Sequence, residues 1–338
     1  MKGIINTTSA RIITLIGLLV LLLFISVQSL LLGLTSINLE MVIQSFTAYD
    51  QSTEHIVIHT TRIPRTLIAL CIGFSLAIAG VLMQTLTRNP LASPGIFGIN
   101  AGASFFIVSF ITFIGVTSLT QMVWVGFLGA AVATVLVLMI GGGLNNNTVS
   151  PFRIVLAGAA ITAFFSSMTQ GILSLNMKTL DEVMFWLAGS IEGRSLDLLI
   201  AVLPYMVIGW FLALIISTKL NTFALGSDIA KGLGQRTGLL YFTVSVVVVL
   251  LAGTSVAVAG PIGFIGLIVP HLARYLVGND HRWVIPFAGV MGTIVLLIAD
   301  ILARLVILPK EVPVGVMTAF IGVPFFIYVI RKEYANKL

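Results

Sequence analysis

The chain alternates between long apolar runs and short polar stretches over nearly its whole length. A helix of about 20 apolar residues crosses a bilayer core of about 30 Å, so each such run predicts one membrane span. The pattern predicts ten spans, at residues 12–33, 66–87, 97–116, 122–141, 154–175, 198–217, 239–259, 262–277, 284–308 and 313–330. The eighth is short and rich in glycine and proline, and we expect it to be tilted, broken or partly re-entrant. The fold class that follows is an all-α membrane protein, with residues 1–338 forming a single polytopic domain of about ten transmembrane helices.

The composition supports this interpretation. Hydrophobic residues make up 58% of the 338 positions and charged residues 9%, whereas a soluble domain carries about 25% charged residues. The first apolar run, Ile12 to Gly33, is longer than the core of a signal peptide, which has about 7–15 residues, so it predicts a retained span. The net charge of +6 does not predict a nucleic-acid partner, because Lys and Arg are scattered at the loop ends. Most of the surface is therefore expected to face membrane lipid.

The positive residues predict an orientation. If the N-terminus is cytoplasmic, 12 of the 18 Lys and Arg residues fall on the inner side and six on the outer side. Positive residues concentrate on the cytoplasmic side of membrane proteins. The six outer residues are Arg62, Arg65, Lys178, Arg194, Arg304 and Lys310. The distribution predicts a multi-pass protein of the plasma (inner) membrane with both termini cytoplasmic.

Two segments of the chain share a pattern of small residues. Gly73–Gly80 and Gly253–Gly260 carry Gly, Ser, Ala, Ala and Gly at equal spacing, in spans predicted to run in opposite directions. Many transporters use such inverted repeats to alternate access around a central pathway. Small residues also recur wherever membrane helices pack closely. Both interpretations stay open, although the first favours a transporter.

A polar inner loop, residues 219–238, interrupts the apolar pattern. Ser227 or Asp228 is expected to cap a short helix in which Ile229 and Leu233 share one face, and Gly234 is expected to end it. A short amphipathic helix suits a groove in a partner protein. The alternative is a helix lying flat on the bilayer, although such helices are usually longer and more basic.

Polar and helix-breaking residues gather at the inner end of span two and in span eight. An interrupted helix is tolerated at membrane depth only inside a bundle or beside a water-filled path. The candidates for the pathway or a gate are Gln84, Asn89, Pro90, Gly263, Gly266, Pro270 and His271. His271 has no second His or carboxylate at helical spacing, so a structural hydrogen bond is favoured over a metal ligand or proton carrier. No metal site is expected.

In span nine, Asp300 and Arg304 are four residues apart, the spacing of an intrahelical ion pair. The pair is interpreted as structural, as the outer rim of a pathway, or as both. The sequence contains no G-x-x-x-x-G-K-[ST], H-E-x-x-H or C-x-x-C motif, so no catalytic residue is expected.

Eight motifs in order resemble the permease subunits of type II ABC importers, the family that takes up iron–siderophores, haem and cobalamin. They are Arg62-Ile-Pro64-Arg65, Gly80-Val-Leu-Met-Gln84, Asn89-Pro-Leu-Ala-Ser-Pro94, Trp186-Leu-Ala-Gly-Ser190, Leu225-Gly226 through Leu233-Gly234, Gly263 to His271, Asp300-Ile-Leu-Ala-Arg304 and Glu311-Val-Pro-Val-Gly315. The resemblance extends from Arg62 to Ile330. The sequence departs from the family's pattern in a polar stretch, residues 141–150, so no gate residue is assigned there.

The resemblance implies a permease with ten helices that pairs with a second permease subunit, as a homodimer or a heterodimer. It also implies two cytoplasmic ATPase subunits, which bind ATP and Mg²⁺, and an extracellular or periplasmic substrate-binding protein; this chain itself is expected to need no cofactor. The implied ATPase-coupling residues are Leu225, Gly226, Ser227, Asp228, Ala230, Leu233 and Gly234. The implied docking residues for the binding protein are Arg62, Arg65 and Arg304.

The expected cargo is a ferric siderophore, with haem or cobalamin as the alternative. A rival of another class is a secondary transporter driven by an ion gradient. That mechanism would require a carboxylate in the middle of the membrane, whereas Asp300, the clearest acid at membrane depth, has Arg304 beside it.

Overall fold

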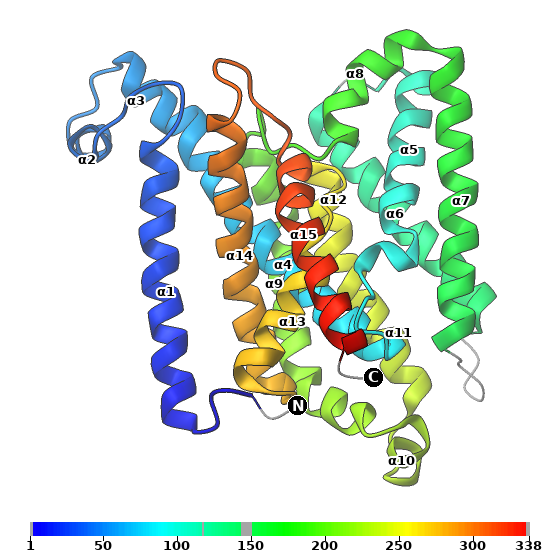
Figure 1. Cartoon of the computed structure of the whole chain (residues 1–338). Helices are drawn as coiled ribbons and strands as arrows, with labels where there is room; N and C mark the ends of the chain where they lie inside the picture. The colour runs from blue at the N-terminus through cyan, green and yellow to red at the C-terminus, as the bar shows by residue number, and fades with distance from the viewer. Residues whose placement is uncertain (1–2, 117, 143–150, 336–338) are drawn as a thin grey trace.

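The computed structural model describes residues 3–116, 118–142 and 151–335, and within these ranges its regular structure is entirely helical. In chain order the helices are α1 (Thr8–Leu31), α2 (Leu39–Thr47), α3 (Thr53–Val57), η1 (Ile58–Arg62), α4 (Ile63–Thr87), η2 (Pro94–Phe97), α5 (Ile99–Ile114), α6 (Leu119–Gly141), α7 (Pro151–Leu175), α8 (Met177–Leu187), α9 (Leu196–Ala224), α10 (Ser227–Gly232), α11 (Thr237–Val248), η3 (Val249–Gly253), α12 (Thr254–Ala259), α13 (Ile265–Val277), α14 (His281–Leu305) and α15 (Val314–Ala335). The bundle is drawn in Figure 1.

Each of the ten predicted spans coincides with a helix. In order they are α1, α4, α5, α6, α7, α9, the continuous α11–η3–α12, α13, α14 and α15. Among the described residues, seven helical stretches are long and apolar enough to cross a membrane, and α5, α13 and α15 are shorter apolar helices. The predicted all-α bundle of about ten helices is confirmed, with boundaries shifted by a few residues; the single-domain assignment stays a prediction.

The bundle has two distinct ends (Figure 1). The short helix α10 lies at one end, toward which α1 begins and α15 ends, and we call this the α10 end. The helices α2, α3 and α8 lie at the opposite end, which we call the α8 end. The sequence pattern does not predict these three helices because they lie in loops. Their starts are capped locally: Asn38 Oδ1 accepts from Met41 N at 2.8 Å, and Asn176 Oδ1 accepts from Thr179 N at 3.2 Å.

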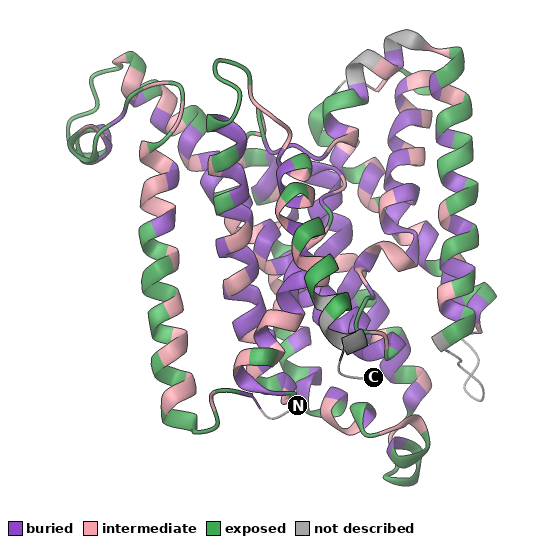
Figure 2. Cartoon of the chain, in the orientation of Figure 1, coloured by how far each residue is buried: buried purple, intermediate pink, exposed green. Residues whose placement is uncertain are grey.

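The core of the bundle is formed around α4, which is buried over most of its length (Figure 2). It packs on α14 at a crossing of glycines, where a Cβ added to Gly73 would lie 2.7 Å from Gly292 O. By contrast, α1 stands at the edge of the bundle, with 6% of its apolar window buried. Most of α1 therefore lies outside the core, whereas α4 contacts mainly other helices.

The two segments with the shared small-residue pattern run in opposite directions, as predicted. The chain descends through α4 from the α8 end and rises through α11–η3–α12 back to it (Figure 1). In both segments the glycines allow close approach: a Cβ on Gly80 would lie 1.9 Å from Gly266 O, and one on Gly260 would lie 2.0 Å from Trp186 O. Close packing thus accounts for the small residues, and an inverted symmetry of the whole fold stays a prediction.

A non-helical connection separates the seventh and eighth spans and lies directly before α13. The helix α12 ends at Ala259, and the connecting residues include Gly260 and Phe264, which have positive φ angles of 72° and 66°. Pro270 lies inside α13, which continues through it. The helix of the eighth span is therefore short but unbroken, and the tilted and partly re-entrant forms stay predictions.

Candidate translocation and coupling sites

A network of buried charges links α4, α14 and the segment before α15 at the α8 end. Asp300 of α14 lies at its centre and is fully buried. Arg65 of α4 donates from Nε to Asp300 Oδ1 at 2.8 Å and from Nη1 to Glu311 Oε2 at 2.5 Å. Arg304 donates from Nε to Asp300 Oδ2 at 3.0 Å. Two guanidinium groups and two carboxylates therefore compensate each other where little water reaches.

The same end of the bundle anchors α1 through backbone carbonyl groups. Arg304 donates to the carbonyl and to the hydroxyl oxygen of Ser29, both at 2.8 Å. Arg62 donates to the carbonyl groups of Leu32 and, at 3.3 Å, Thr35. These bonds hold the end of α1 and the following loop against α4 and α14.

The three arginines implied to dock the binding protein are buried. The exposed fractions of Arg62, Arg65 and Arg304 are 4%, 4% and 2%, so Arg62 and Arg65, which were expected near the surface, do not lie there in this structure. The predicted Asp300–Arg304 pair is confirmed. Helical spacing could not reveal that Arg65, which is 235 positions from Asp300, completes it. A docking role for these arginines stays a prediction, and it now requires the network to open.

The helices α4 and α13 meet closely near the α10 end. Their backbones touch at Gly80 and Gly266. One turn further along α4, Gln84 donates from Nε2 to Leu267 O at 3.0 Å and accepts a hydrogen bond from Arg274 Nη1. Gln84 therefore joins two helices in a buried contact, and a gating role for Gln84 and Gly266 stays a prediction.

His271 connects α13 to the turn that follows α4. Its Nε2 lies 2.8 Å from Pro90 O, and this nitrogen must donate because a carbonyl oxygen only accepts. In the same turn, Asn89 Oδ1 accepts from Leu91 N at 2.9 Å. The hydrogen-bonded role predicted for His271 is confirmed. The gating role of Asn89, Pro90 and His271 stays a prediction.

The remaining pathway candidates, Gly263 and Pro270, differ in exposure. Pro270 is buried within α13, whereas Gly263 is exposed in the break before it. A Cβ added at Gly263 would meet no heavy atom within 4 Å. Of the two, Gly263 has open space beside it.

An exposed polar stripe runs along α7, which the sequence analysis did not identify. Ser166, Gln170 and Ser174 are exposed and follow one another at intervals of four, so they share one face of the helix. The neighbouring Ser167 lines a pocket of about 340 Å³ together with Thr112 of α5. Polar side chains at membrane depth usually face a bundle interior or a water-filled cavity. The interval of four is the sequence signal that could have identified this stripe.

Three large apolar side chains are exposed around α10. The exposed fractions of Leu225, Ile229 and Leu233 are 64%, 54% and 66%. On the opposite side of the helix, Ala230 is fully buried against the rest of the bundle. The predicted amphipathic helix is confirmed, and its apolar face has no partner among the described residues.

Glycine determines where α10 begins and ends. The N-cap is Gly226, with φ 138° and ψ 142°, and no side chain caps the helix, so the expected capping by Ser227 or Asp228 is wrong. The helix ends as predicted: Gly234 has φ 79°, and Gln235 N donates to Ala230 O at 2.9 Å. Both glycines adopt backbone angles that other residues adopt at a cost.

The model of the FecCD transport family matches residues 18–332. The chain belongs to the FecCD transport family. The chain is thus a permease subunit of an ABC importer, a transporter and not an enzyme, and ATP hydrolysis belongs to a separate subunit.

Individual FecCD relatives match over nearly their whole lengths. "Probable siderophore transport system permease protein YfiZ" of Bacillus subtilis (strain 168) is 51% identical, covering 96% of this chain and 97% of the relative. Ferric enterobactin transport system permease protein FepD of Escherichia coli (strain K12) is 42% identical, covering 98% of each. A solved inward-facing structure of an ABC transporter described as of metal-chelate type has a TM-score of 0.83, with 30% identity, and covers 94% of this chain and 99% of that one.

The sequence assigned no functional role to two charged residues between α8 and α9, Arg194 and Glu192. Arg194, between α8 and α9, has a buried Nε without a hydrogen-bond partner among the described residues, and burial lowers its pKa. Nearby in sequence, Glu192 is exposed; partial burial and the neighbouring Glu311 raise its pKa. The described residues hold no group of three or more His, Cys, Asp or Glu side chains that could bind a metal ion, and the absence of a metal site stays a prediction. The polar stretch 143–150 lies outside the described residues.

Proposed function

We propose that this chain is the permease of an importer for ferric siderophores in the plasma membrane, assembled with a second permease subunit. Two cytoplasmic ATPases with bound ATP and Mg²⁺ drive it, and an external binding protein delivers the cargo. The α10 end faces the cytoplasm and the α8 end faces outward.

The exposed apolar face of α10 is the observation that carries this proposal. Leu225, Ile229 and Leu233 are each more than half exposed at the tip of the bundle. Exposed apolar side chains on a short helix suit a hydrophobic groove in a partner protein. The glycines at both ends hold the helix in a defined position, so movement of an ATPase against α10 would be transmitted to α9 and α11.

The polar face of α7 supports a pathway between two permease subunits. Ser166, Gln170 and Ser174 are exposed in the single chain, although lipid is an unfavourable neighbour for them. A second subunit packed across this face would enclose them beside a water-filled passage. Hydroxyl and amide groups along such a passage could bind a large polar chelate weakly enough to release it.

The outer arginines are assigned a positioning role in this proposal. Arg65 and Arg304 hold Asp300, and Arg62 holds the loop after α1. They thereby fix the surface on which a binding protein would dock. Direct contact with acidic groups of that protein would first require one of these bonds to break.

The relatives favour iron as the cargo. They are described as permeases for siderophore, Fe(3+)-citrate, ferric enterobactin and iron(3+)-hydroxamate transport. A ferric siderophore is therefore proposed ahead of haem or cobalamin. A secondary transporter is disfavoured because Asp300, fully buried, is already paired with Arg65 and Arg304.

Reconstitution tests the proposal. The permease, with its ATPase and binding protein, is expected to accumulate a ⁵⁵Fe-labelled siderophore in vesicles only when ATP is supplied. The chain without the ATPase should neither hydrolyse ATP nor concentrate cargo. Accumulation driven by a proton or sodium gradient alone would contradict the proposal, and accumulation of haem or cobalamin in place of iron chelates would reassign the cargo.

Thiol labelling tests the orientation in a Cys71→Ala background. Lys231→Cys on α10 should be protected from an impermeant reagent in intact cells, whereas Glu192→Cys between α8 and α9 should react. Both positions are exposed, so accessibility depends on the side of the membrane. Reaction at position 231 from outside would contradict the orientation.

A further inference from the structure

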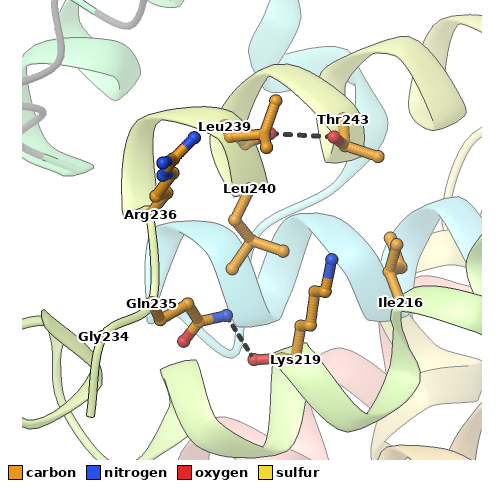
Figure 3. Close-up of a pocket in the computed structure, with 8 residues that line it drawn as sticks. All are labelled: Ile216, Lys219, Gly234, Gln235, Arg236, Leu239, Leu240 and Thr243. Atoms are coloured by element: carbon orange, nitrogen blue, oxygen red, sulfur yellow. Dashed lines mark hydrogen bonds between the residues drawn. The ribbon is translucent and has the colours of Figure 1, made fainter.

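A pocket of about 290 Å³ lies between α9, the end of α10 and the start of α11 (Figure 3). Its lining combines two cations with apolar side chains and includes Ile216, Lys219, Gln235, Arg236, Leu239 and Thr243. No acidic residue lines it. The pocket therefore has the chemistry of a site for an amphipathic anion.

The two cations are available to a ligand. Neither the Lys219 ammonium nor the Arg236 guanidinium bonds to another described residue, and both residues are exposed. The backbone carbonyl of Lys219 accepts from Gln235 Nε2 at 2.9 Å, which holds the loop after α10 against α9 (Figure 3). The hydrogen bond thus holds together the two backbone segments that carry Lys219 and Arg236, and neither cation is paired with a carboxylate of the described residues.

The start of α11 adds a further attraction for an anion. Arg236 is the N-cap of α11, and its side chain does not bond to the amide groups of the helix's first turn. Such amide groups and the helix dipole favour a bound phosphate. This favours an oxyanion over a neutral polar ligand.

The depth of the pocket matches the level of lipid headgroups. The 29 residues of α9 extend about 43 Å, whereas the hydrocarbon core measures about 30 Å. A centred helix therefore extends about 6 Å beyond the core at each end. Lys219 lies about 7 Å before the last residue of α9, Ala224, and so near the boundary between core and headgroups.

The surface around the pocket is apolar and faces outward. Ile215 of α9 and Phe242 of α11 are 67% and 49% exposed, and Leu239, which lines the pocket, is 54% exposed. A ligand with acyl chains could cover these side chains while its charged head lay against Lys219 and Arg236. The apolar face of α10, which is assigned to the ATPase, does not line the pocket.

We propose that this pocket binds the phosphate group of an anionic phospholipid, such as phosphatidylglycerol, in the leaflet at the α10 end. Lys219, Arg236 and the first turn of α11 hold the phosphate, and Leu239 and Ile216 contact the start of the acyl chains. Bound lipid braces the loop after α10 between α9 and α11. Anionic lipid is therefore expected to raise the efficiency with which α10 transmits force.

Lipid retention by the purified chain tests the proposal. The chain is placed in phosphatidylcholine nanodiscs containing graded amounts of phosphatidylglycerol, and bound lipid is counted by native mass spectrometry. Lys219→Gln and Arg236→Gln are each expected to weaken retention about fivefold, and the double variant about 20-fold. Lys231→Gln, an exposed cation outside the pocket, should leave it unchanged, and Lys219→Arg should preserve it.

Four outcomes would overturn the assignment. If the double variant retains as much phosphatidylglycerol as the unmodified chain, the pocket is not the binding site. If Lys231→Gln lowers retention as much as the pocket variants do, the lipid responds to the overall positive charge and not to this pocket. Displacement of phosphatidylglycerol by dissolved inorganic phosphate assigns the pocket to a soluble anion. Retention by the chain alone but not by the assembled importer assigns the cations to a protein partner. The assay on the chain alone needs neither ATPase nor cargo, so its failure leaves the importer function standing.

Discussion

The two ends of the bundle use charged and apolar side chains in opposite ways. At the α8 end, Arg65, Arg304 and Asp300 are buried and paired with one another. At the α10 end, apolar Ile229 and Leu233 are exposed and have no partner within the described chain. Charge is thus used inside the protein to join helices, and apolar surface is left outside for contact with other molecules. Residue type alone is therefore a poor guide to which end binds a partner.

Removal of the central carboxylate is the most severe test of this contrast. Asp300→Ala leaves Arg65 and Arg304 buried without the carboxylate that bonds to both, and we expect a loss of about 3–5 kcal/mol in the free energy of unfolding. The measurement is the unfolding midpoint of the purified chain in detergent. Asp197→Ala, an exposed acid at the start of α9, is the matched control and should change stability by at most about 0.5 kcal/mol. Equal effects of the two changes would show that the buried network does not stabilise the bundle.

The paired and unpaired arginines at the α8 end give the next test. Arg65→Gln leaves Asp300 and Glu311 with one guanidinium fewer, and we expect a loss of about 3 kcal/mol. Arg194→Gln removes a half-buried charge that has no counter-charge. The free energy of unfolding should therefore stay within about 0.5 kcal/mol of that of the unmodified chain, or rise. Thermal unfolding compares the two variants. A larger loss for Arg194→Gln would contradict the contrast.

This result also determines how a docking experiment must be designed. Arg62→Glu with Arg65→Glu would place new carboxylates beside Asp300, so folded protein itself should be lost. A fall in uptake by that variant would therefore not identify a docking surface. Quantification of folded permease in the membrane separates the two causes.

A substitution at the start of α10 is expected to have a smaller effect on stability. Gly226→Val forces a branched side chain into a backbone with φ 138°, at a cost of about 1–3 kcal/mol that falls on α10. Hydrogen exchange of the α10 amides should accelerate while the amides of α4 stay protected. Gly232→Ala is the matched control, since a Cβ there would meet no heavy atom within 4 Å. Equal exchange in both variants would show that the glycine angle is not needed.

The exposed face of α10 should affect binding and not folding. Ile229→Ser with Leu233→Ser removes apolar surface that has no partner among the described residues, so stability should change by at most about 0.5 kcal/mol. Affinity for the ATPase should fall by at least a factor of about ten, because each side chain is expected to fill a pocket in the partner. Binding is measured with the purified ATPase, and Lys231→Ser is the control. Normal affinity would remove this face from the interface.

The smallest effect concerns pH at the start of α14. Asp280 caps this helix, and its hydrogen bonds with Arg282 lower its pKa to about 2. A carboxylate whose pKa is lower in the folded state stabilises above the unfolded value of about 3.9. That contribution is lost as the pH falls from about 4 toward 2. Because Arg282 is exposed and Asp280 is partly exposed, this contribution amounts to less than about 1 kcal/mol. Asp280→Asn should remove this pH dependence from the unfolding midpoint, and an unchanged profile would contradict the assignment.

The sequence predicted the elements that depend on local pattern. Apolar length predicted all ten helices, because crossing a membrane requires each span to satisfy its own backbone hydrogen bonds. Local spacing likewise predicted the Asp300–Arg304 pair, the apolar face of α10 and its end at Gly234. The small helices α2, α3 and α8 were missed because they lie in loops, where apolar length carries no signal.

Only the tertiary structure decided which groups lie against one another. The spacing of Arg62 and Arg65 places them at the end of a span, but helix packing alone brings Arg65 to Asp300 and buries both arginines. The exposure of Ser166 and Gln170, and the meeting of Lys219 with Arg236 in one pocket, also depend on how whole helices are arranged. The physical reason is range: a helix forms from contacts within about four residues, whereas burial and pairing depend on residues far apart in the chain.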